Sequence, residues 1–258
     1  FPMLEFHMSD RDLRLDPDRY LDKKFIETNM IVHGIEQFED GFIFDLASHD
    51  EDIIKRSLEE IERLNNHINK LKKYFKNEKI PVVINLGGHS DYKFNDLNIA
   101  DKKLNNVIKN FEIIRNKYPL LEFLPQTMPP YPWHQGGRSY HNILTNYKYI
   151  EKFLSLTDSD ICLDVSHTYL SANFWGEDFI DYIKLLGNRI KHIHLADASG
   201  INGEGLEIGD GTINFKSFHE TIKTYTKKCF LVPEIWQGHM NNGIKFFNAL
   251  NRFNEIIN

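Results

Sequence analysis

Three residues that could bind one divalent metal ion are spread through the second half of the chain. Asp164, His194 and Glu234 lie 30 and 40 residues apart, and each stands at the end of a short apolar run. Two carboxylates neutralise a divalent cation, and the imidazole favours Zn²⁺, Mn²⁺, Co²⁺ or Fe²⁺, with Mg²⁺ a further candidate. An unpaired carboxylate at the buried position of Glu234 would cost several kcal/mol, so a cationic partner is expected. The alternative is a hydrogen-bonded ring of the three side chains around an ordered water.

Other polar residues that could do chemistry also follow apolar runs. They are His7, His33, His49, Asn85, His89, Gln126, His167 and Asp197. A lone histidine at such a place is more often structural, but many strand ends converging on one rim are hard to explain by packing. His33, His89, Asp197 and Glu204 are expected to bind substrate.

Two loops carry further candidates. The glycine-rich stretch His192–Gly211 contains Glu204, and its glycines allow tight turns and close approach to a ligand, or else form a flexible connector. The stretch Pro129–Asn142 concentrates aromatic residues with Trp133 and Arg138. Such side chains suit a sugar ring carrying a carboxylate or phosphate, and the alternative is a proline-stiffened lid over the site.

The elements that must position these residues alternate between short β-rich runs and longer amphipathic runs. This alternation predicts parallel strands joined by helices. The expected strands are Met3–Met8, Met30–Ile35, Phe42–Leu46, Val82–Leu86, Leu121–Leu124, Ile161–Val165, Ile190–Leu195 and Phe230–Ile235. The expected helices are Asp52–Phe75, Ile99–Lys117, Asn142–Leu156, Phe179–Leu186, Phe215–Lys227 and Gly243–Ile256, with a further helical segment mainly after Pro17.

Eight strands in 258 residues predict an α/β fold, a single-domain (β/α)₈ TIM barrel. In such a barrel the polar strand ends meet at one rim, where function collects. The link Glu36–Gly41 is too short for a helix, so one barrel helix is expected to be missing or displaced.

The composition argues against nucleic-acid binding and against a membrane-spanning segment. A net charge of −6 argues against nucleic acid, and no apolar run is long enough for a membrane helix. Two cysteines make a structural disulfide unexpected and favour the cytoplasm. The chain begins with Phe rather than Met, so an excised domain with a fused or associated upstream partner is a further expectation.

The stretches ICLDVSH, HIHLADASGINGEGLEIGDG and FLVPEIW together resemble the xylose-isomerase-like barrel superfamily, most strongly over Leu121–Trp236. This superfamily contains sugar and sugar-phosphate isomerases and epimerases, inosose dehydratases and the apurinic endonuclease IV enzymes. The resemblance implies one metal ion held by a Glu, an Asp, a His and a second Glu. The last three positions match Asp164, His194 and Glu234, whereas the first is Gln126.

The resemblance implies a metal-dependent isomerase, epimerase or related lyase that moves a proton alpha to the carbonyl of a sugar or sugar derivative. By this resemblance Glu234 is expected to carry a proton and Gln126 to stand at the fourth metal position. Gln126 cannot act as a carboxylate base, so a second proton carrier is expected among His167, His33 and His89, with His167 named first. One alternative is a barrel module that has lost catalysis and binds a sugar or a partner domain. An endonuclease is less favoured, because Asn85 and Gln126 stand where its three-zinc cluster needs other ligands.

Overall fold

The computed structural model describes residues 2–21, 25–131 and 139–258. Its helices and strands fall into two compact units, residues 1–88 with 98–125, and residues 89–97 with 126–258. Parallel strands with helical crossovers make both units α/β, as the alternating sequence pattern predicts.

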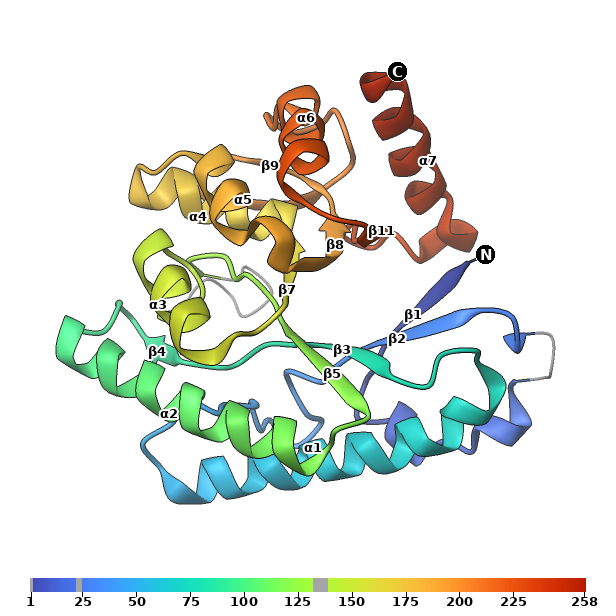
Figure 1. Cartoon of the computed structure of the whole chain (residues 1–258), viewed down its shortest axis with the longest axis vertical. Coiled ribbons are helices and arrows are strands. Elements are labelled where there is room, and N and C mark those ends of the chain that lie inside the picture. Colours follow the sequence, from blue (N-terminus) through green and yellow to red (C-terminus); the bar gives the residue numbers. More distant parts are fainter. Residues whose placement is uncertain (1, 22–24, 132–138) are drawn as a thin grey trace. The chain divides into compact units, whose positions relative to one another are not determined.

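The first unit contains one parallel sheet of four strands in the order β1-β2-β3-β5. Its strands are β1 (Met3–His7), β2 (Asn29–His33), β3 (Ile80–Ile84) and β5 (Leu121–Pro125). Figure 1 shows α1 (Glu51–Leu71) and α2 (Leu97–Lys117) side by side along one face of this sheet. Asp50 starts α1 by accepting the N–H groups of Asp52 and Ile53. The predicted apolar stripe is the buried face of α1, with Ile61, Leu64 and Ile68.

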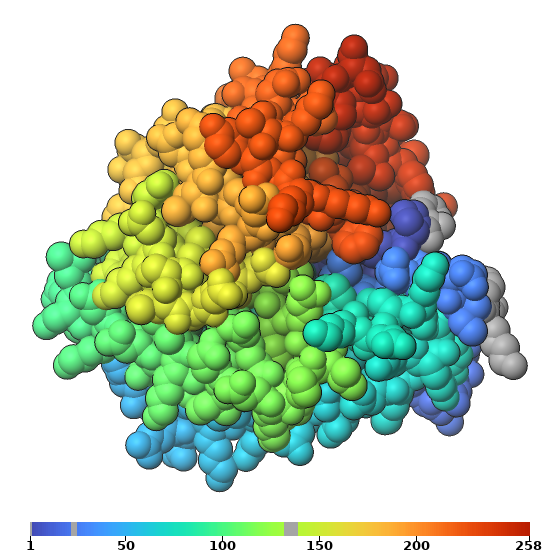
Figure 2. Space-filling view, in the orientation of Figure 1, coloured from blue at the N-terminus to red at the C-terminus, as the bar shows by residue number. Residues whose placement is uncertain are grey.

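The second unit contains a three-stranded parallel sheet in the order β11-β8-β7. These strands are β7 (Ile161–Asp164), β8 (Ile190–Leu195) and β11 (Phe230–Pro233). Its helices are α3 (Tyr147–Thr157), α4 (Val165–Trp175), α5 (Phe179–Leu186), α6 (Phe215–Tyr225) and α7 (Met240–Ile257). Helices α4 to α7 contact one another in chain order, and Figure 2 shows the orange and red surfaces of α6 and α7 adjoining.

Two antiparallel ribbons, which the sequence did not predict, complete the second unit. In one, β4 (His89–Asp91) pairs with β6 (Ser139–His141), and in the other β9 (Asp197–Ser199) pairs with β10 (Gly203–Leu206). Short 3₁₀ turns lie at η1 (Asp12–Arg14), η2 (Pro17–Arg19), η4 (Lys72–Tyr74) and η6 (Gly187–Arg189). Among the described residues, no helix combines the length and apolarity needed to span a bilayer.

Three sequence-based assignments of elements were wrong. The predicted strand Phe42–Leu46 is an irregular segment that forms only the isolated bridge Gln37–Ile43, because the chain turns back at Gly41 with φ 86°. The described residues after Pro17 form a 3₁₀ turn rather than a helix. The third error is the omission of α4, which starts directly where β7 ends. The absence of a helix in Glu36–Gly41 is confirmed.

Candidate metal centre

The register of three parallel strands brings the predicted metal ligands together. Asp164 at the end of β7 pairs with His194 on β8. Glu234 directly follows β11, and its N–H group donates to the carbonyl of Leu195 at 3.0 Å. Gln126 forms an isolated parallel bridge with Cys162, two residues before Asp164. Residues from four distant parts of the sequence therefore share one end of this sheet.

The side chains of these residues converge around the imidazole of His194. Its Nδ1 lies 2.6 Å from Oε2 of Glu234 and 3.8 Å from Oδ2 of Asp164. The amide Nε2 of Gln126 lies 3.0 Å from the same Nδ1 and 3.1 Å from Oδ2 of Asp164. Gln126, Asp164 and His194 are buried, whereas the side chain of Glu234 is 33% exposed. The cluster is thus open to solvent on the side of Glu234.

This donor set fits a divalent cation. Asp164, His194 and Glu234 each offer a ligand atom, and these atoms all lie within 4.8 Å of one another. Burial raises the pKa of Asp164 to about 7, His167 opposes this rise, and the nearby Glu234 adds to it. A bound cation would remove this penalty by stabilising both carboxylates. Gln126 can join as a neutral ligand if its amide turns its carbonyl oxygen inward.

The carboxylate of Asp164 is held in a fixed orientation. It caps the N-terminus of α4, where its Oδ1 accepts the N–H of His167 at 2.7 Å. Its backbone N–H donates to the hydroxyl of Thr127 at 2.9 Å, and its carbonyl accepts the hydroxyl of Thr168 at 2.6 Å. These bonds leave Oδ2 directed toward Gln126 and His194, so the helix cap also positions a candidate metal ligand.

His167 lies beside the ligand cluster in contact with a second acidic residue. Its Nδ1 is 3.2 Å from the carbonyl of Thr127 and 3.5 Å from Oδ2 of Asp164, and its Nε2 is 3.8 Å from Oε1 of Glu204. Burial opposes protonation of His167, but Asp164 and Glu204 outweigh it and raise its pKa to about 9. The structure therefore brings together His167 and Glu204, two of the residues predicted from the sequence.

The β9–β10 ribbon places Glu204. The N–H of Gly205 donates to the hydroxyl of Ser166 at 3.0 Å, and the carbonyl of Gly205 accepts the N–H of Trp236 at 2.8 Å. Gly205 has φ +69°, and an added Cβ would meet the backbone N of Trp236 at 3.3 Å. A glycine is needed here for both reasons. The ribbon is thereby tied to the start of α4 and to the segment after Glu234.

Asp197 holds the glycine-rich loop in place, and its contact with substrate stays a prediction. Its Oδ1 accepts the N–H groups of Ala198 and Ile213 at 2.8 and 3.2 Å. Its Oδ2 accepts those of Gly209 and Gly211 at 2.9 and 3.0 Å. A buried carboxylate with four backbone donors fixes the loop, so this loop is not a flexible connector.

The other predicted substrate-binding residues are more dispersed. His33 belongs to the first unit, where its ring stacks on His7 with 4.3 Å between centroids. His89 lies on β4 in the second unit, with its ring 4.6 Å from that of His141. Their contact with substrate stays a prediction. Trp133 and Arg138 lie outside the described residues.

An aromatic cluster combines two residues of the Pro129–Asn142 loop with residues from elsewhere in the chain, and it was not predicted from the sequence. Tyr131 contacts Tyr140 and Phe174, and Phe94 contacts Tyr140, Phe174 and Trp175, with 4.9–5.8 Å between ring centroids. The aromatic loop residues suggested only part of it, because Phe94 and the end of α4 come from distant segments. It surrounds the C-terminal end of α4, whereas Asp164 caps the opposite end of that helix.

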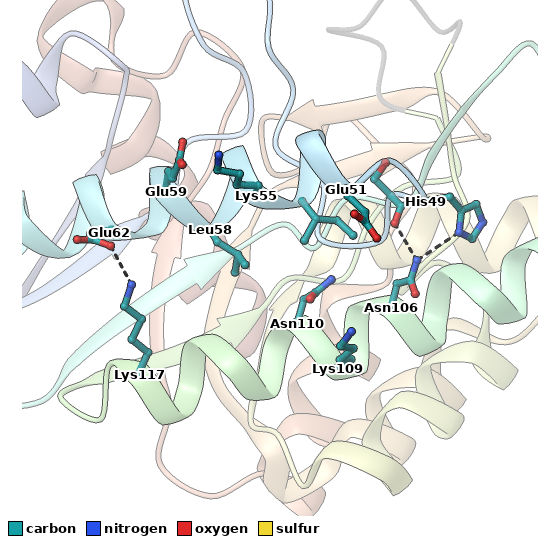
Figure 3. A pocket seen from close by; sticks show the side chains of 12 residues that line it. His49, Glu51, Lys55, Leu58, Glu59, Glu62, Asn106, Lys109, Asn110 and Lys117 are labelled. Atoms are coloured by element: carbon teal, nitrogen blue, oxygen red, sulfur yellow. Dashed lines mark hydrogen bonds and ion pairs between the residues drawn. The ribbon is translucent and has the colours of Figure 1, made fainter.

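A separate groove of about 640 Å³ lies in the first unit between α1 and α2. Figure 3 shows side chains from both helices along it, including the ion pair of Lys117 with Glu62 at 2.8 Å. Asn106 crosses the groove and donates to the carbonyl of Ser48 at 2.7 Å. Of the candidates named from the sequence, His49 lines it, but the predicted metal ligands do not, so the metal-ligand cluster remains the candidate centre.

Comparison with protein families and curated proteins gives one match over almost the whole chain. The profile of the xylose isomerase-like TIM barrel family matches residues 1–250. An uncharacterized Methanocaldococcus jannaschii protein, MJ1614, is 29% identical over 125 residues, which are 48% of this chain and 44% of that protein. A second uncharacterized protein of that organism, MJ1311, is 28% identical over 109 residues, or 42% and 36% of the two chains. The similarity thus spans less than half of each curated relative.

Solved structures show the same fold over the whole chain. A D-tagatose 3-epimerase-like protein has a TM-score of 0.68 and 21% identity, covering 100% of this chain and 90% of its own. An L-ribulose 3-epimerase has a TM-score of 0.64 and 15% identity, and the match covers 100% of this chain and 84% of the epimerase. The IolI protein, solved with a zinc atom bound, has a TM-score of 0.69 and 10% identity, and the match covers 100% of this chain and 88% of IolI. At these identities the likeness concerns the fold.

Proposed function

Because this chain belongs to the xylose isomerase-like TIM barrel family, we propose that it is a metal-dependent isomerase or epimerase of a sugar or sugar derivative. The observation that carries this proposal is the convergence of Asp164, His194 and Glu234 within 4.8 Å, open to solvent beside Glu234. The epimerases among the structures of similar fold support the substrate class.

The metal ligands would be Asp164, His194 and Glu234, with Gln126 as a weak neutral fourth. When bound, a divalent cation supplies Lewis-acid polarisation of substrate oxygens, which eases removal of the proton alpha to a carbonyl. The IolI structure with its zinc atom supports a divalent metal in this fold. The imidazole among the ligands favours Zn²⁺, Mn²⁺, Co²⁺ or Fe²⁺.

Proton transfer would fall to the partly exposed side chains of the centre. Glu234 combines a ligand position with the only substantial exposure in the cluster, so its carboxylate can meet a substrate proton. His167 and Glu204 stand beside it and can share a second proton between imidazole and carboxylate. This pair would take the place of the carboxylate that Gln126 lacks.

The second candidate is a barrel module that binds a sugar or a partner without turnover. One observation favours it: the amide of Gln126 donates to Asp164 at 3.1 Å and its Nε2 lies 3.0 Å from Nδ1 of His194, so a neutral side chain links the two other candidate ligands. A carboxylate at that position could not do this without a proton or a cation.

Metal content and turnover separate the two candidates. The chain is stripped with a chelator, reloaded with Mn²⁺, Co²⁺ or Zn²⁺, and assayed on a panel of aldoses and ketoses, free and phosphorylated. We expect metal-dependent interconversion of one sugar pair, loss of this activity in Glu234→Gln, and its retention in the exposed control Glu255→Gln. Stoichiometric metal without turnover on the whole panel would favour the binding module.

A further inference from the structure

A second set of metal-binding side chains lies one layer below the candidate centre. Side chains two residues apart on a strand point to the same face, so Cys162 on β7 shares a face with Asp164, and His192 on β8 shares one with His194. Cys162 and His192 are directly paired in the ladder, as are Asp164 and His194. The two layers are therefore separated by about 6.6 Å along the strands.

The lower layer is closely packed and hidden from solvent. Cys162, His192 and His194 each offer a ligand atom, and these atoms lie within 4.8 Å of one another. Their exposures are 0%, 0% and 1%. The rings of His192 and His194 are edge to face, with 4.9 Å between centroids. His194 thus belongs to both layers, while Cys162 and His192 belong to the lower one alone.

We propose that Cys162, His192 and His194 form a second cation site, suited to thiophilic ions such as Zn²⁺, Co²⁺ and Cd²⁺. One thiolate and two imidazoles are a donor set of this class, whereas the upper cluster offers mainly oxygen. Ligand atoms about 2.0–2.3 Å from a tetrahedral ion stand about 3.3–3.8 Å apart. A cluster already within 4.8 Å reaches this geometry by side-chain shifts of about 1 Å.

Binding of an ion at the lower site releases protons. The thiol of Cys162 releases its proton to solvent and binds as thiolate, and with the upper cluster empty both imidazoles bind in their neutral form. If both sites are filled, His194 releases its remaining proton as well and bridges the two ions through its two ring nitrogens. A divalent ion with one thiolate and two neutral imidazoles carries one net positive charge. The site requires no redox step. It shares His194 with the proposed catalytic centre, but Cys162 and His192 take no part in the proposed sugar chemistry.

The competing explanation is a buried hydrogen-bonded group that only orients the ring of His194. Thiolate-to-metal charge-transfer absorption distinguishes the two, because it arises only when sulfur binds the ion. The chain contains just two cysteines, so Cys229, which is half buried, provides a matched control. The experiment is a titration of the chelator-treated, fully reduced chain with Co²⁺, repeated with Cd²⁺, followed in the near ultraviolet.

We expect a charge-transfer band that saturates in the wild type and persists in Cys229→Ser and in Glu234→Gln. Cys162→Ser should abolish the band, and His192→Asn should weaken the apparent Co²⁺ affinity by roughly tenfold or more, as losing a ligand costs at least as much as losing its support. Because Glu234 belongs only to the Asp164–His194–Glu234 cluster, persistence of the band in Glu234→Gln shows that the ion is bound at the Cys162 site. Circular dichroism of each variant verifies that it is folded.

No band in saturated wild type would overturn the proposal, whatever the variants do, and so would a band that survives in Cys162→Ser. If Cys162→Ser fails to fold, the wild type and His192→Asn still decide between sulfur ligation and none. Failure of the sugar-isomerase proposal would appear as absent turnover with the charge-transfer band intact. The two ideas can therefore fail separately.

Discussion

Removal of the carboxylate of Asp197 tests whether this residue holds the glycine-rich loop. In Asp197→Ala, four backbone N–H groups lose their acceptor, those of Ala198, Gly209, Gly211 and Ile213. Each bond to a charged acceptor contributes about 1.5–3 kcal/mol. Four independent bonds would sum to about 6–12 kcal/mol, but entering water and loop relaxation restore part of this. We expect a loss of about 3–5 kcal/mol in the free energy of unfolding.

Asp197→Asn separates charge from shape. The amide keeps one acceptor oxygen for two of the N–H groups and turns its own NH₂ toward the other two. The expected loss is about 2–3 kcal/mol. The control is Asp210→Asn in the same loop. The side chain of Asp210 is exposed, and its Oδ1 forms a long ion pair of 3.7 Å with Nη1 of Arg252. An exposed pair of this kind contributes about 1 kcal/mol or less.

Urea denaturation of the metal-free chain, followed by circular dichroism, measures these differences. Equal m-values in all variants are required for the comparison. If the free energy of unfolding of Asp197→Ala lies within about 1 kcal/mol of the wild-type value, the four hydrogen bonds do not stabilise the loop as argued.

Three further predictions concern the centre and its loop. Gln126→Glu should tighten Mn²⁺ or Zn²⁺ binding, measured by calorimetry, because it replaces a neutral oxygen with a carboxylate; unchanged affinity would remove Gln126 from the ligand set. The raised pKa of His167 predicts that, in the metal-free chain, the contribution of this residue to stability is fully present below about pH 6.5 and that about 1–3 kcal/mol is lost as the pH rises through 9, since the folded state keeps a proton that the unfolded state releases. His167→Gln should flatten that dependence in urea unfolding, and an unaltered slope would refute the assignment. Gly211→Ala should lower the Tm, because an added Cβ would stand 2.3 Å from Oδ1 of Asp197, and a Tm equal to that of the wild type would contradict this.

The candidate metal ligands could be predicted from the sequence because they follow strands of simple pattern. The apolar residues before Asp164 and His194 form buried strands, Val232 and Pro233 belong to a half-buried one, and the ends of parallel strands meet at one edge. Ladder pairing then fixes which residues are neighbours, as with Asp164 and His194. Gln126 was foreseen for the same reason, since it directly follows β5.

Helix α4 and the loop contacts could not be predicted, because their determinants are tertiary. The buried residues of α4 include Val165, Ser166, Thr168 and Ala172, which form no single apolar stripe in the sequence. The role of Asp197 depends on backbone donors up to 16 residues away. Phe42–Leu46 has a strand-like composition, and Phe44 and Leu46 are buried, yet the segment is irregular and forms no ladder. Burial alone therefore does not distinguish a strand from a packed loop.

The most direct test of the metal centre is the metal content of His194→Ala. His194 is the residue around which Gln126, Asp164 and Glu234 converge, and it is also the shared ligand of the lower layer. Wild type and variant are loaded with Mn²⁺, Co²⁺ or Zn²⁺, desalted, and analysed by elemental mass spectrometry with His219→Ala as a histidine control. We predict about one or more ions per wild-type and control chain and almost none in His194→Ala. Equal metal per chain in His194→Ala and the wild type would contradict the assignment of this site.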